Sequence, residues 1–430
     1  MSKRLMCPGI FVSTPDLRQS LMSVLEGLTQ ASLLKGVITM TAFDITKRMP
    51  AFLWSIRKFL PMSLRKGIER RRVPEFLAGK VRLFCWYDLP RLLIERIAGP
   101  VIAQKIWLQG EYAFDRYVAR HISGRYFCLY GVEHSSLESF MRQKAAGGLC
   151  LLRQVSSHGR SVAEIQRRVF AQFPEYLNSY GRLILKDSQR SVARKEQEYA
   201  LADLIVANSP YVRDTFLEHG FNEKNVISIP TGFPAVGVGR AQAGSGDKPL
   251  RFIFAGNLSV RKGIPYLIQA WNAMAAGNRA ELILAGHMEF SPGILRALHG
   301  NWRYVGALSQ EALYSMYGTA DVFILPTLFE GRSHGVLEAM SFGLPVITTV
   351  QSGCADCITS GIHGILVKAA DVDSLYQAMR WCLENRSKLL SMGESCRNQA
   401  ARWTMHDSNK QHLDALVSFL QERVQVRERA

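Results

Sequence analysis

Two glutamates, Glu330 and Glu338, flank a stretch of seven residues at a predicted helix start. The apolar run 321–326 comes before them, and another apolar run, 345–350, follows the predicted helix. Ionised carboxylate oxygens accept hydrogen bonds from sugar hydroxyl groups, and the charge strengthens these bonds. The pattern therefore indicates a site for a hydroxyl-rich ligand where a strand passes into a helix.

The ends of this helix are marked by residues that favour helix termini. Ser333 is predicted to cap the first turn, Gly343 to end the helix in a left-handed conformation, and Pro345 to open the next strand. The order is strand, loop, helix, strand. In such a βαβ unit the helix N-terminus, here near Gly335, offers N–H groups and a partial positive charge that can bind a phosphate.

The rest of the second half of the chain alternates between strand and helix patterns. We predict strands near 251–256, 281–286 and 302–306, and helices near 264–275, 309–319, 371–385, 387–401 and 407–424. Alternation of this kind predicts a parallel sheet with helices on both faces.

The first half of the chain contains shorter apolar runs that are plausible buried strands. They lie at 36–41, 81–85, 126–130 and 149–153. His158 follows the last of them, at the carboxyl end of a strand, where open α/β sheets bind ligands. His134 follows the run 126–130 and is a second candidate.

A Gly-rich segment without hydrophobic periodicity, 235–248, predicts a flexible linker. Its Gly237 and Gly239 do not form a dinucleotide loop, because Gln242 occupies the third glycine position. The 430 residues suit two large α/β domains. We expect an N-terminal domain over 1–235, a linker over 236–248, a C-terminal domain over 249–405 and a final helix over 406–430 that crosses back to the first domain.

The formal net charge of +17 indicates an anionic partner or surface. Apolar residues of the segment 52–60 share one helical face, and Arg and Lys residues cluster over 57–72. This pattern is typical of a helix on an anionic membrane, and it equally fits a core-facing helix followed by a solvated basic loop. No nucleic-acid-binding module is recognisable, so no nucleic-acid partner is predicted.

No apolar run approaches the roughly 18 residues that span a bilayer, and the stretch 5–12 is too short for a signal peptide, so a cytoplasmic protein is predicted. The eight cysteines are expected to be reduced and largely buried. Cys354 and Cys357 are interpreted as loop thiols, and Asp371 and Asp373 as residues of a helix cap. We therefore predict no metal site.

The motif from Glu330 to Glu338, with the segment 337–347 that continues it, resembles the E-x7-E region of retaining glycosyltransferases of family 4, the glycosyl transferases group 1. The resemblance extends from about residue 196 to residue 405. Further segments similar to that family are 203–209, 229–232, 251–263 and 361–367. In the family, the segment that 251–263 resembles holds the donor diphosphate.

This resemblance implies an α/β protein of the GT-B fold, with two Rossmann-like doubly wound domains facing across a cleft. It implies transfer of a sugar from a nucleoside-diphosphate sugar to an acceptor hydroxyl, with retention at the anomeric carbon. The acceptor would be a glycan or a lipid-linked glycan of envelope polysaccharide, lipopolysaccharide or glycolipid biosynthesis. No cofactor besides the nucleotide sugar is expected.

The resemblance also assigns roles to residues at matching positions. Glu330 would hold donor-sugar hydroxyls, His158 would approach the same sugar, and Lys262 would stabilise the departing diphosphate. Glu338 would accept hydrogen bonds from the ribose hydroxyls. The remaining donor-binding candidates are Gly256, Asn257, Arg261, Ser333, Gly335 and Val336. Asn257 stands where the family often has an arginine, and Arg261 is a candidate to replace that charge.

Two alternatives on the same fold remain open. A sugar-nucleotide epimerase would convert its donor without an acceptor, and a scaffold would bind a nucleotide sugar without turnover. The asparagine at position 257 is the feature that suggests a scaffold. Product analysis separates the three functions.

Overall fold

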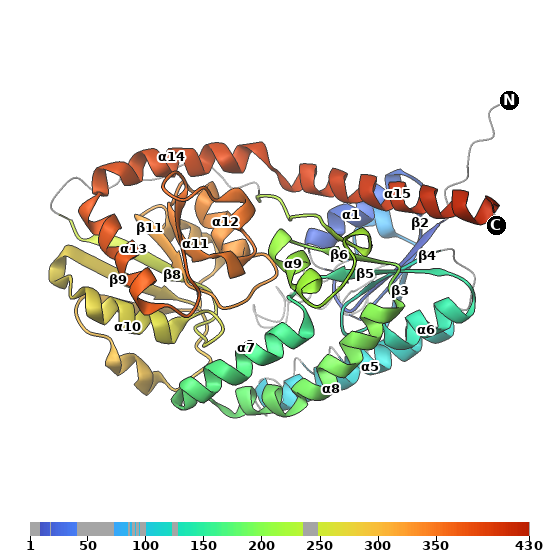
Figure 1. Cartoon of the computed structure of the whole chain (residues 1–430), viewed down its shortest axis with the longest axis horizontal. Coiled ribbons are helices and arrows are strands. Elements are labelled where there is room, and N and C mark those ends of the chain that lie inside the picture. Colours follow the sequence, from blue (N-terminus) through green and yellow to red (C-terminus); the bar gives the residue numbers. More distant parts are fainter. Residues whose placement is uncertain are drawn as a thin grey trace, which may run out of the picture. The chain divides into compact units, whose positions relative to one another are not determined.

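The computed structural model describes residues 9–17, 19–40, 73–84, 87, 91, 94, 100–122, 128–234 and 248–429 (Figure 1). The predicted helix at 52–60, the basic cluster at 57–72 and the predicted linker up to residue 247 lie outside these ranges.

The chain divides into two compact units, and each unit is built from more than one stretch of the sequence. The first unit comprises Met1–Gln154, Arg190–Val206 and Asn409–Ala430, and the second comprises Val155–Gln189 and Ala207–Ser408. Most of the final helix therefore belongs to the first unit.

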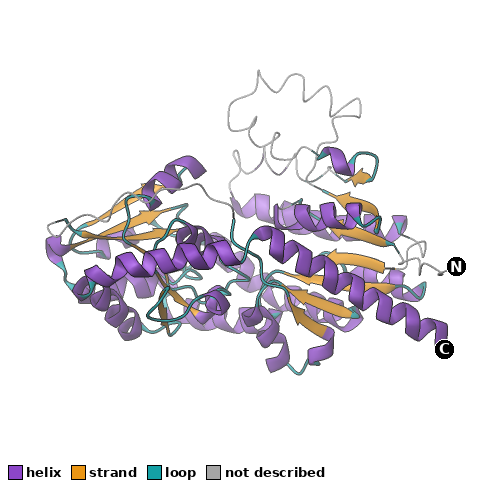
Figure 2. Cartoon of the chain, turned by 90° about the horizontal axis from the view of Figure 1, so that it is seen from above, coloured by secondary structure: helices purple, strands orange, loops and turns teal. Residues whose placement is uncertain are grey.

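The described strands form two sheets (Figure 2). One is seven-stranded, in the order β3-β2-β1-β4-β5-β6-β7. Its strands are β1 (Ile10–Thr14), β2 (Leu34–Thr39), β3 (Val81–Leu83), β4 (Cys128–Val132), β5 (Leu149–Gln154), β6 (Leu204–Ala207) and β7 (Val226–Ser228). The pairs β1/β2, β2/β3, β1/β4 and β4/β5 are parallel.

The second sheet is six-stranded, in the order β10-β9-β8-β11-β12-β13, and its neighbouring strands are all parallel. Its strands are β8 (Leu250–Ala255), β9 (Ala280–Ala285), β10 (Trp302–Gly306), β11 (Val322–Leu325), β12 (Val346–Thr349) and β13 (Gly364–Val367). The chain runs outward from β8 to one edge and then returns to β11 to build the other half. The switch point between β8 and β11 is where doubly wound sheets bind ligands.

The described α-helices lie between these strands, except for α13, α14 and α15, which follow β13. They are α1 (Gln19–Gln30), α5 (Pro100–His121), α6 (Leu137–Ala145), α7 (Gly159–Gln172), α8 (Ser179–Leu201), α9 (Pro210–Glu218), α10 (Ile264–Met274), α11 (Gln310–Tyr317), α12 (His334–Ser341), α13 (Val372–Glu384), α14 (Arg386–Arg402) and α15 (Met405–Arg429). In the second unit α10 packs against α13, and α12 packs against α14. Among the described residues, no helix is both long enough and apolar enough to cross a membrane.

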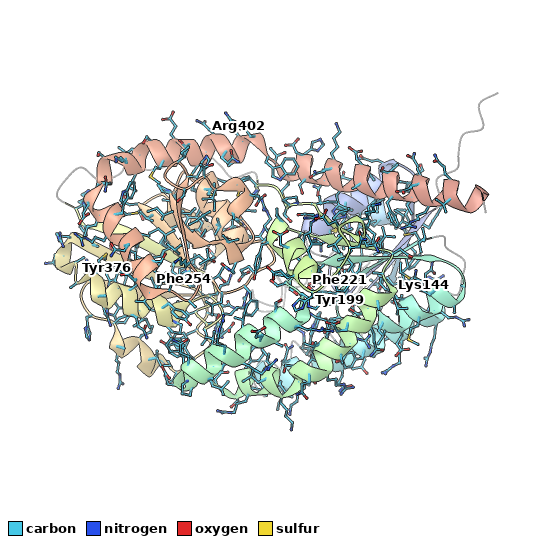
Figure 3. All side chains as sticks on the ribbon, in the orientation of Figure 1. Lys144, Tyr199, Phe221, Phe254, Tyr376 and Arg402 are labelled. Carbon is cyan, nitrogen blue, oxygen red and sulfur yellow. The ribbon has the colours of Figure 1, made fainter. Side chains whose placement is uncertain are left out.

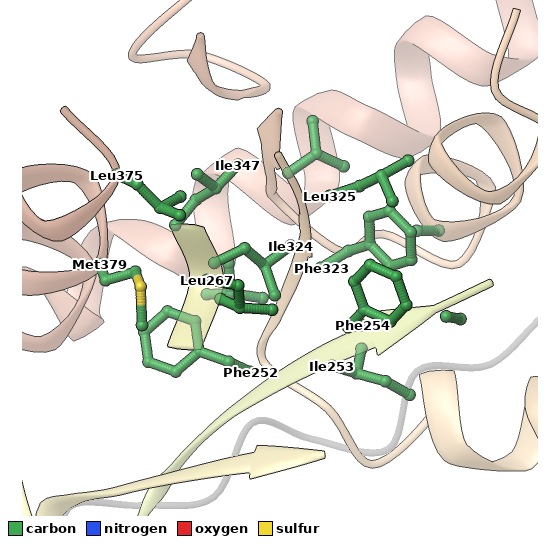
Figure 4. Packing of buried hydrophobic residues seen from close by; sticks show 14 of the residues in the cluster. Phe252, Ile253, Phe254, Leu267, Phe323, Ile324, Leu325, Ile347, Leu375 and Met379 are labelled. Atoms are coloured by element: carbon green, nitrogen blue, oxygen red, sulfur yellow. The ribbon is translucent and has the colours of Figure 1, made fainter. Parts of the chain in front are cut away.

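The hydrophobic core of the second unit is built around its central strands, β8 and β11. The segments 252–255 of β8 and 322–325 of β11 are continuous apolar runs, as expected for parallel strands that are covered on both faces. Phe252, Phe323 and Ile324 are fully buried. Figure 4 shows them packed with Leu267 of α10 and with side chains of β12 and α13.

The predicted α/β architecture is confirmed. Every strand and helix predicted after residue 250 is present, within a few residues of the predicted ends. Gly343 has the predicted left-handed conformation, with φ 76°. Asp371 caps α13 by accepting a 2.8 Å hydrogen bond from the backbone N–H of Ser374. In the first half, the predictions did not include β1, a fully buried strand that pairs with both β2 and β4.

Candidate functional site

Two loops meet at the switch point of the second sheet. One follows β8 and leads into α10, and the other follows β11 and leads into α12. The backbone N–H of Leu328 donates to the carbonyl of Arg261 (2.8 Å), and the hydroxyl of Thr327 donates to the same carbonyl (3.1 Å). These bonds bring Arg261 and Lys262 beside the segment that carries Glu330.

Gly263 explains why the two loops can approach so closely. Its φ is 77°, in the left-handed region that side chains disfavour. A Cβ atom at this position would lie 1.9 Å from the carbonyl oxygen of Pro326, at the end of β11. Glycine is therefore required both by the backbone conformation and by the space.

Three charged side chains form the centre of the site. Lys262 Nζ lies 2.5 Å from Glu330 Oε1, and Arg261 Nη1 also forms an ion pair with this oxygen. The side chains of Lys262 and Glu330 are 11% and 13% exposed, whereas that of Arg261 is 37% exposed. The structure thus brings together the two predicted phosphate-binding cations and the predicted sugar-binding carboxylate.

The electrostatics of Lys262 follow from its burial. Burial lowers the pKa of Lys262, the ion pair with Glu330 opposes this shift, and the charge of Arg261 adds to it. The partly desolvated charge interacts more strongly with an anion than a solvated lysine would.

The loop that carries Glu330 is held by backbone contacts with segments far away in the sequence. Gly331 accepts a 2.6 Å hydrogen bond from the hydroxyl of Ser209, just after β6. A Cβ atom at Gly331 would lie 1.8 Å from the carbonyl oxygen of Val155, just after β5. The segments after β5, β6 and β11 therefore meet at Gly331.

The start of α12 lies beside the end of β8. A Cβ atom at Gly335 would lie 3.5 Å from the carbonyl oxygen of Ala255. The first N–H groups of a helix have no carbonyl partner within it, so those near Gly335 can serve an anion. The side chain of Val336 is fully buried in the core, so only its backbone could take part in donor binding.

The predicted role of the Ser333 side chain as a cap is wrong. Ser333 does occupy the N-cap position, but its side chain makes no capping hydrogen bond. Its backbone N–H instead donates to the carbonyl of Ser352 (2.9 Å), and its carbonyl faces the thiol of Cys354 (3.5 Å). Contacts with the 352–354 segment therefore hold this residue.

Glu338 lies on the second turn of α12 and is half-buried. Burial raises its pKa above the ordinary value for glutamate. The hydrogen-bond-accepting carboxylate therefore forms at a higher pH than that of an exposed glutamate. The structure places it near Tyr314 and Tyr317, whose pKa values rise chiefly through burial and partly through the charge of Glu338.

Asn257 and Gly256 lie at the beginning of the loop after β8. The amide of Asn257 donates a 2.9 Å hydrogen bond to Glu289 Oε1. Sequence reasoning did not identify Glu289, since a lone acidic residue in a loop carries no signal. Gly256 has φ 147°, and a Cβ atom there would lie 3.9 Å from Lys262 Cε, so the lysine side chain passes close to this backbone.

His158 is not part of the charged cluster formed by Arg261, Lys262 and Glu330. It is the N-cap of α7, with Nδ1 accepting from the backbone N–H of Arg160 (3.3 Å), and its side chain is fully buried. Its ring packs on His219 at 4.1 Å and on Phe221 at 5.7 Å between centroids. Phe221 is labelled in Figure 3. Val155, three residues before His158, lies against Gly331 of the loop that carries Glu330, and a contact of His158 with a donor sugar remains a prediction.

The second histidine candidate, His134, lies in the first unit within a network of buried charges. Its φ is 72°, an unusual conformation for a residue other than glycine. Its backbone N–H donates to Glu198 Oε2 (2.6 Å), its carbonyl accepts from Arg194 (3.0 Å), and Nδ1 lies 2.9 Å from Glu111 Oε2. Burial raises the pKa of Glu198 to about 7. These contacts account for the strained backbone at the end of β4.

Arg332 is a residue of the motif that sequence reasoning missed. Its side chain is 1% exposed. It donates to the carbonyl oxygens of Thr231 (2.6 Å) and Gly353 (2.8 Å) and pairs with Asp356 (2.6 Å). It therefore holds two segments, around Thr231 and 353–356, against the loop of Glu330. The sequence carried no signal for this role, because its partners are mostly backbone carbonyls.

We expect Arg332→Met to destabilise the protein by about 3–5 kcal/mol, because it leaves two buried carbonyls and a carboxylate without their donor. Urea unfolding followed by circular dichroism measures this change. Arg380→Met is the matched control, because the side chains of Arg380 and its partner Glu384 are both more than half exposed. Equal unfolding midpoints for the two variants would contradict the structural role of Arg332.

The fold and the charged cluster define a class: a two-sheet α/β protein with two cations and a carboxylate at the switch point of its second sheet. Residues 249–385 match the model of a family described as "Glycosyl transferases group 1". The matched part of the chain contains the charged cluster of Arg261, Lys262 and Glu330.

Curated relatives agree with this match. An uncharacterised glycosyltransferase of Methanocaldococcus jannaschii is 28% identical over 141 residues, which cover 32% of this chain and 36% of that protein. The O-antigen chain mannosyltransferase B of Escherichia coli is 30% identical over 131 residues, which cover 29% of this chain and 34% of that protein. The matches thus span only about a third of these two relatives.

Solved structures extend the likeness to nearly the whole chain. HepE of Anabaena, solved in complex with UDP-glucose, superposes with a TM-score of 0.57 at 12% identity, covering 96% of this chain and 100% of that one. The lipopolysaccharide outer core galactosyltransferase WaaB gives a TM-score of 0.57 at 13% identity, covering 95% and 99%. These similarities confirm the GT-B fold.

Proposed function

We propose that this protein is a retaining glycosyltransferase that moves a sugar from a nucleoside-diphosphate sugar to an acceptor hydroxyl. The observation that carries this proposal is the cluster of Lys262, Arg261 and Glu330 beside the start of α12, at the switch point of the second sheet. The group 1 match over 249–385 and the relatives named as mannosyltransferases support it.

The cations have a direct role in this chemistry. A departing nucleoside diphosphate gains negative charge as the glycosidic bond breaks, and preformed positive charges lower the energy of that state. Lys262, Arg261 and the first N–H groups of α12 supply those charges. Without donor, Glu330 balances both cations, so the diphosphate would take over their charge and release Glu330 to the sugar hydroxyls.

The other proposed contacts complete the donor site. Glu338 accepts hydrogen bonds from the ribose, Asn257 and Gly256 line the loop that faces the diphosphate, and His158 approaches the donor sugar. Since protein cations neutralise the diphosphate, we propose that transfer requires no divalent metal. The acceptor is a glycan or lipid-linked glycan of an envelope polysaccharide, lipopolysaccharide or glycolipid. We place the protein in the cytoplasm, with the basic segment 57–72 able to contact an anionic membrane.

A panel of UDP-, GDP-, ADP- and dTDP-sugars in EDTA tests the proposal. We expect one donor to raise the thermal unfolding temperature and to release nucleoside diphosphate slowly, with a new glycoside when a suitable acceptor is present. An isomerised donor would identify an epimerase, and bound but unchanged donor would identify a scaffold. Release that requires added magnesium would contradict metal independence while leaving the transferase function intact.

A further inference from the structure

A cavity of about 260 Å³ lies in the second unit next to the charged cluster. One wall is formed by α7 and the first turns of α8, and the other by the loops around residues 257–261, 289–290 and 328–329. Arg261 lines the cavity and also pairs with Glu330. The cavity therefore adjoins the proposed sugar-transfer site.

Contacts between these two walls hold the cavity in shape. The amide of Asn178 donates to the backbone carbonyl of Glu289. The ring of Tyr176 packs edge-on against Phe290, with centroids 5.0 Å apart. Specific contacts therefore join the helical wall to the loop wall.

Both walls of the cavity combine apolar side chains, several of them aromatic, with polar ones. Examples are Phe170, Tyr180 and Gln166 on the helices and Phe329, Asn257 and Glu289 on the loops. Ligand sites typically pair apolar and aromatic surface with a few polar groups that fix the orientation of the ligand. A sugar ring matches such a lining, because it has apolar C–H faces and a rim of hydroxyl groups.

Three of these polar side chains have hydrogen-bonding capacity that the described part of the protein does not use. The amide of Asn257 donates to Oε1 of Glu289, and no group of the described residues donates to its Oε2. Within the same ranges, the hydroxyl of Tyr180 and the amide of Gln166 form no hydrogen bond with the protein. A hydrocarbon ligand would leave these groups without partners, which is unfavourable, whereas hydroxyl groups would pair with them.

The charges around the cavity favour a neutral ligand. Burial raises the pKa of Tyr180, the charge of Glu289 adds to this shift, and the charge of Arg261 opposes it, so both charges lie near this phenol. Arg261 is already paired with Glu330. A second ligand therefore meets the carboxylate of Glu289, which repels an anion and accepts strong hydrogen bonds from hydroxyl groups.

We infer that this cavity binds one neutral sugar ring, the terminal unit of the acceptor, with its hydroxyl groups hydrogen-bonded to Glu289, Tyr180 and Gln166. The inference rests on the proposed transferase function and specifies its acceptor. The volume of about 260 Å³ is close to the lower limit, roughly 300 Å³, of small-molecule sites. The cavity therefore encloses a single ring, and the rest of the acceptor lies outside it.

Saturation-transfer NMR on the full-length protein tests the inference. The ligands are the methyl pyranosides of glucose, galactose, mannose and N-acetylglucosamine, each compared with the uronic acid of the same ring, in the presence of saturating UDP or GDP. We expect at least one neutral glycoside to bind, and to bind at least about tenfold more tightly than its acid, because Glu289 repels the second carboxylate.

Three results would overturn the inference. They are the absence of binding by every glycoside, equal affinities for a neutral glycoside and its acid, and displacement of the glycoside by the nucleoside diphosphate, which would assign the cavity to the donor. Donor hydrolysis measured in the same preparation shows separately whether the transferase function stands.

Variants locate the binding. Glu289→Gln keeps the oxygen that accepts from Asn257 but loses the charge, so it should weaken binding of the neutral glycoside about tenfold and abolish the preference over its acid. Tyr180→Phe should weaken binding by about 3- to 10-fold through the lost hydrogen bond. Tyr376→Phe, on α13 and outside the cavity, removes the same hydroxyl group elsewhere and should leave binding unchanged.

Equal losses for Tyr180→Phe and Tyr376→Phe, or an unchanged preference in Glu289→Gln, would contradict binding in this cavity. Glycoside binding that depends on Tyr180 and Glu289, in a protein that releases no nucleoside diphosphate from any nucleotide sugar, would instead count against the proposed function alone.

Discussion

Lys262→Met is expected to lower turnover of the nucleotide-sugar donor by about 10²–10³-fold, the usual effect of losing one preformed charge that stabilises a developing anion. Methionine keeps the length and the apolar stem of the side chain but removes the charge next to Glu330. Because the lysine charge also attracts the diphosphate of the intact donor, donor affinity should weaken as well. Steady-state release of nucleoside diphosphate over a range of donor concentrations measures both effects.

Two further variants separate charge from structure in this prediction. Burial lowers the pKa of Lys262, so turnover should decline at a lower pH than for an ordinary lysine, and Lys262→Arg should extend activity to higher pH. Lys410→Met, at an exposed position on α15, should leave turnover unchanged. A fully active Lys262→Met enzyme would rule out the proposed role of this lysine.

Glu330→Gln is expected to reduce turnover by about 10- to 100-fold without weakening donor binding. A hydrogen bond to a charged group contributes about 1.5–3 kcal/mol, and the neutral amide loses most of this toward the donor-sugar hydroxyls. The same change removes the negative charge that competes with the diphosphate for Lys262 and Arg261. Donor affinity should therefore stay constant or increase, the opposite of the effect expected for Lys262→Met.

Glu281→Gln is a closely matched control for this experiment. The Glu281 side chain is also 13% exposed and also pairs with two cations, Arg251 at 3.1 Å and Arg303 at 2.7 Å. It lies on β9, outside the proposed site, so its loss should alter stability slightly and turnover not at all. A fall in donor affinity for Glu330→Gln, or equal turnover losses in the two variants, would show that Glu330 acts only by holding the structure.

The elements of the second sheet were predictable because local patterns agree with the fold. The continuous apolar runs at 252–255 and 322–325, the glycine at 343 and the aspartate at 371 each specify a strand or a helix end within a few residues. The first half was harder to predict. The short run of β1 follows Pro8 and Gly9, and its strand character comes from its pairing with β2 and β4.

For the candidate site, too, some features were predictable from local sequence and others depend on contacts between distant segments. The two glutamates already predicted a site for a hydroxyl-rich ligand, and the family resemblance predicted that Lys262 binds the diphosphate. The direct pairing of Glu330 with both cations required the strand order, because β8 and β11 are neighbours in the sheet but far apart in sequence. The roles of Arg332 and Glu289 depend on partners in distant loops, and the burial of His158 depends on the rings of His219 and Phe221, which follow α9.

The sequence by itself determined the two-part α/β organisation, the order of elements after residue 250 and the chemical types at the candidate donor site, because periodicity, turn residues and functional groups are local properties. Only the tertiary structure decided which loops meet at Glu330, that Ser333 is held by Ser352 rather than by a side-chain cap, and that α7 and α8 line a cavity that Arg261 also lines. These outcomes depend on contacts between segments that are distant in sequence, and packing of the whole unit selects them.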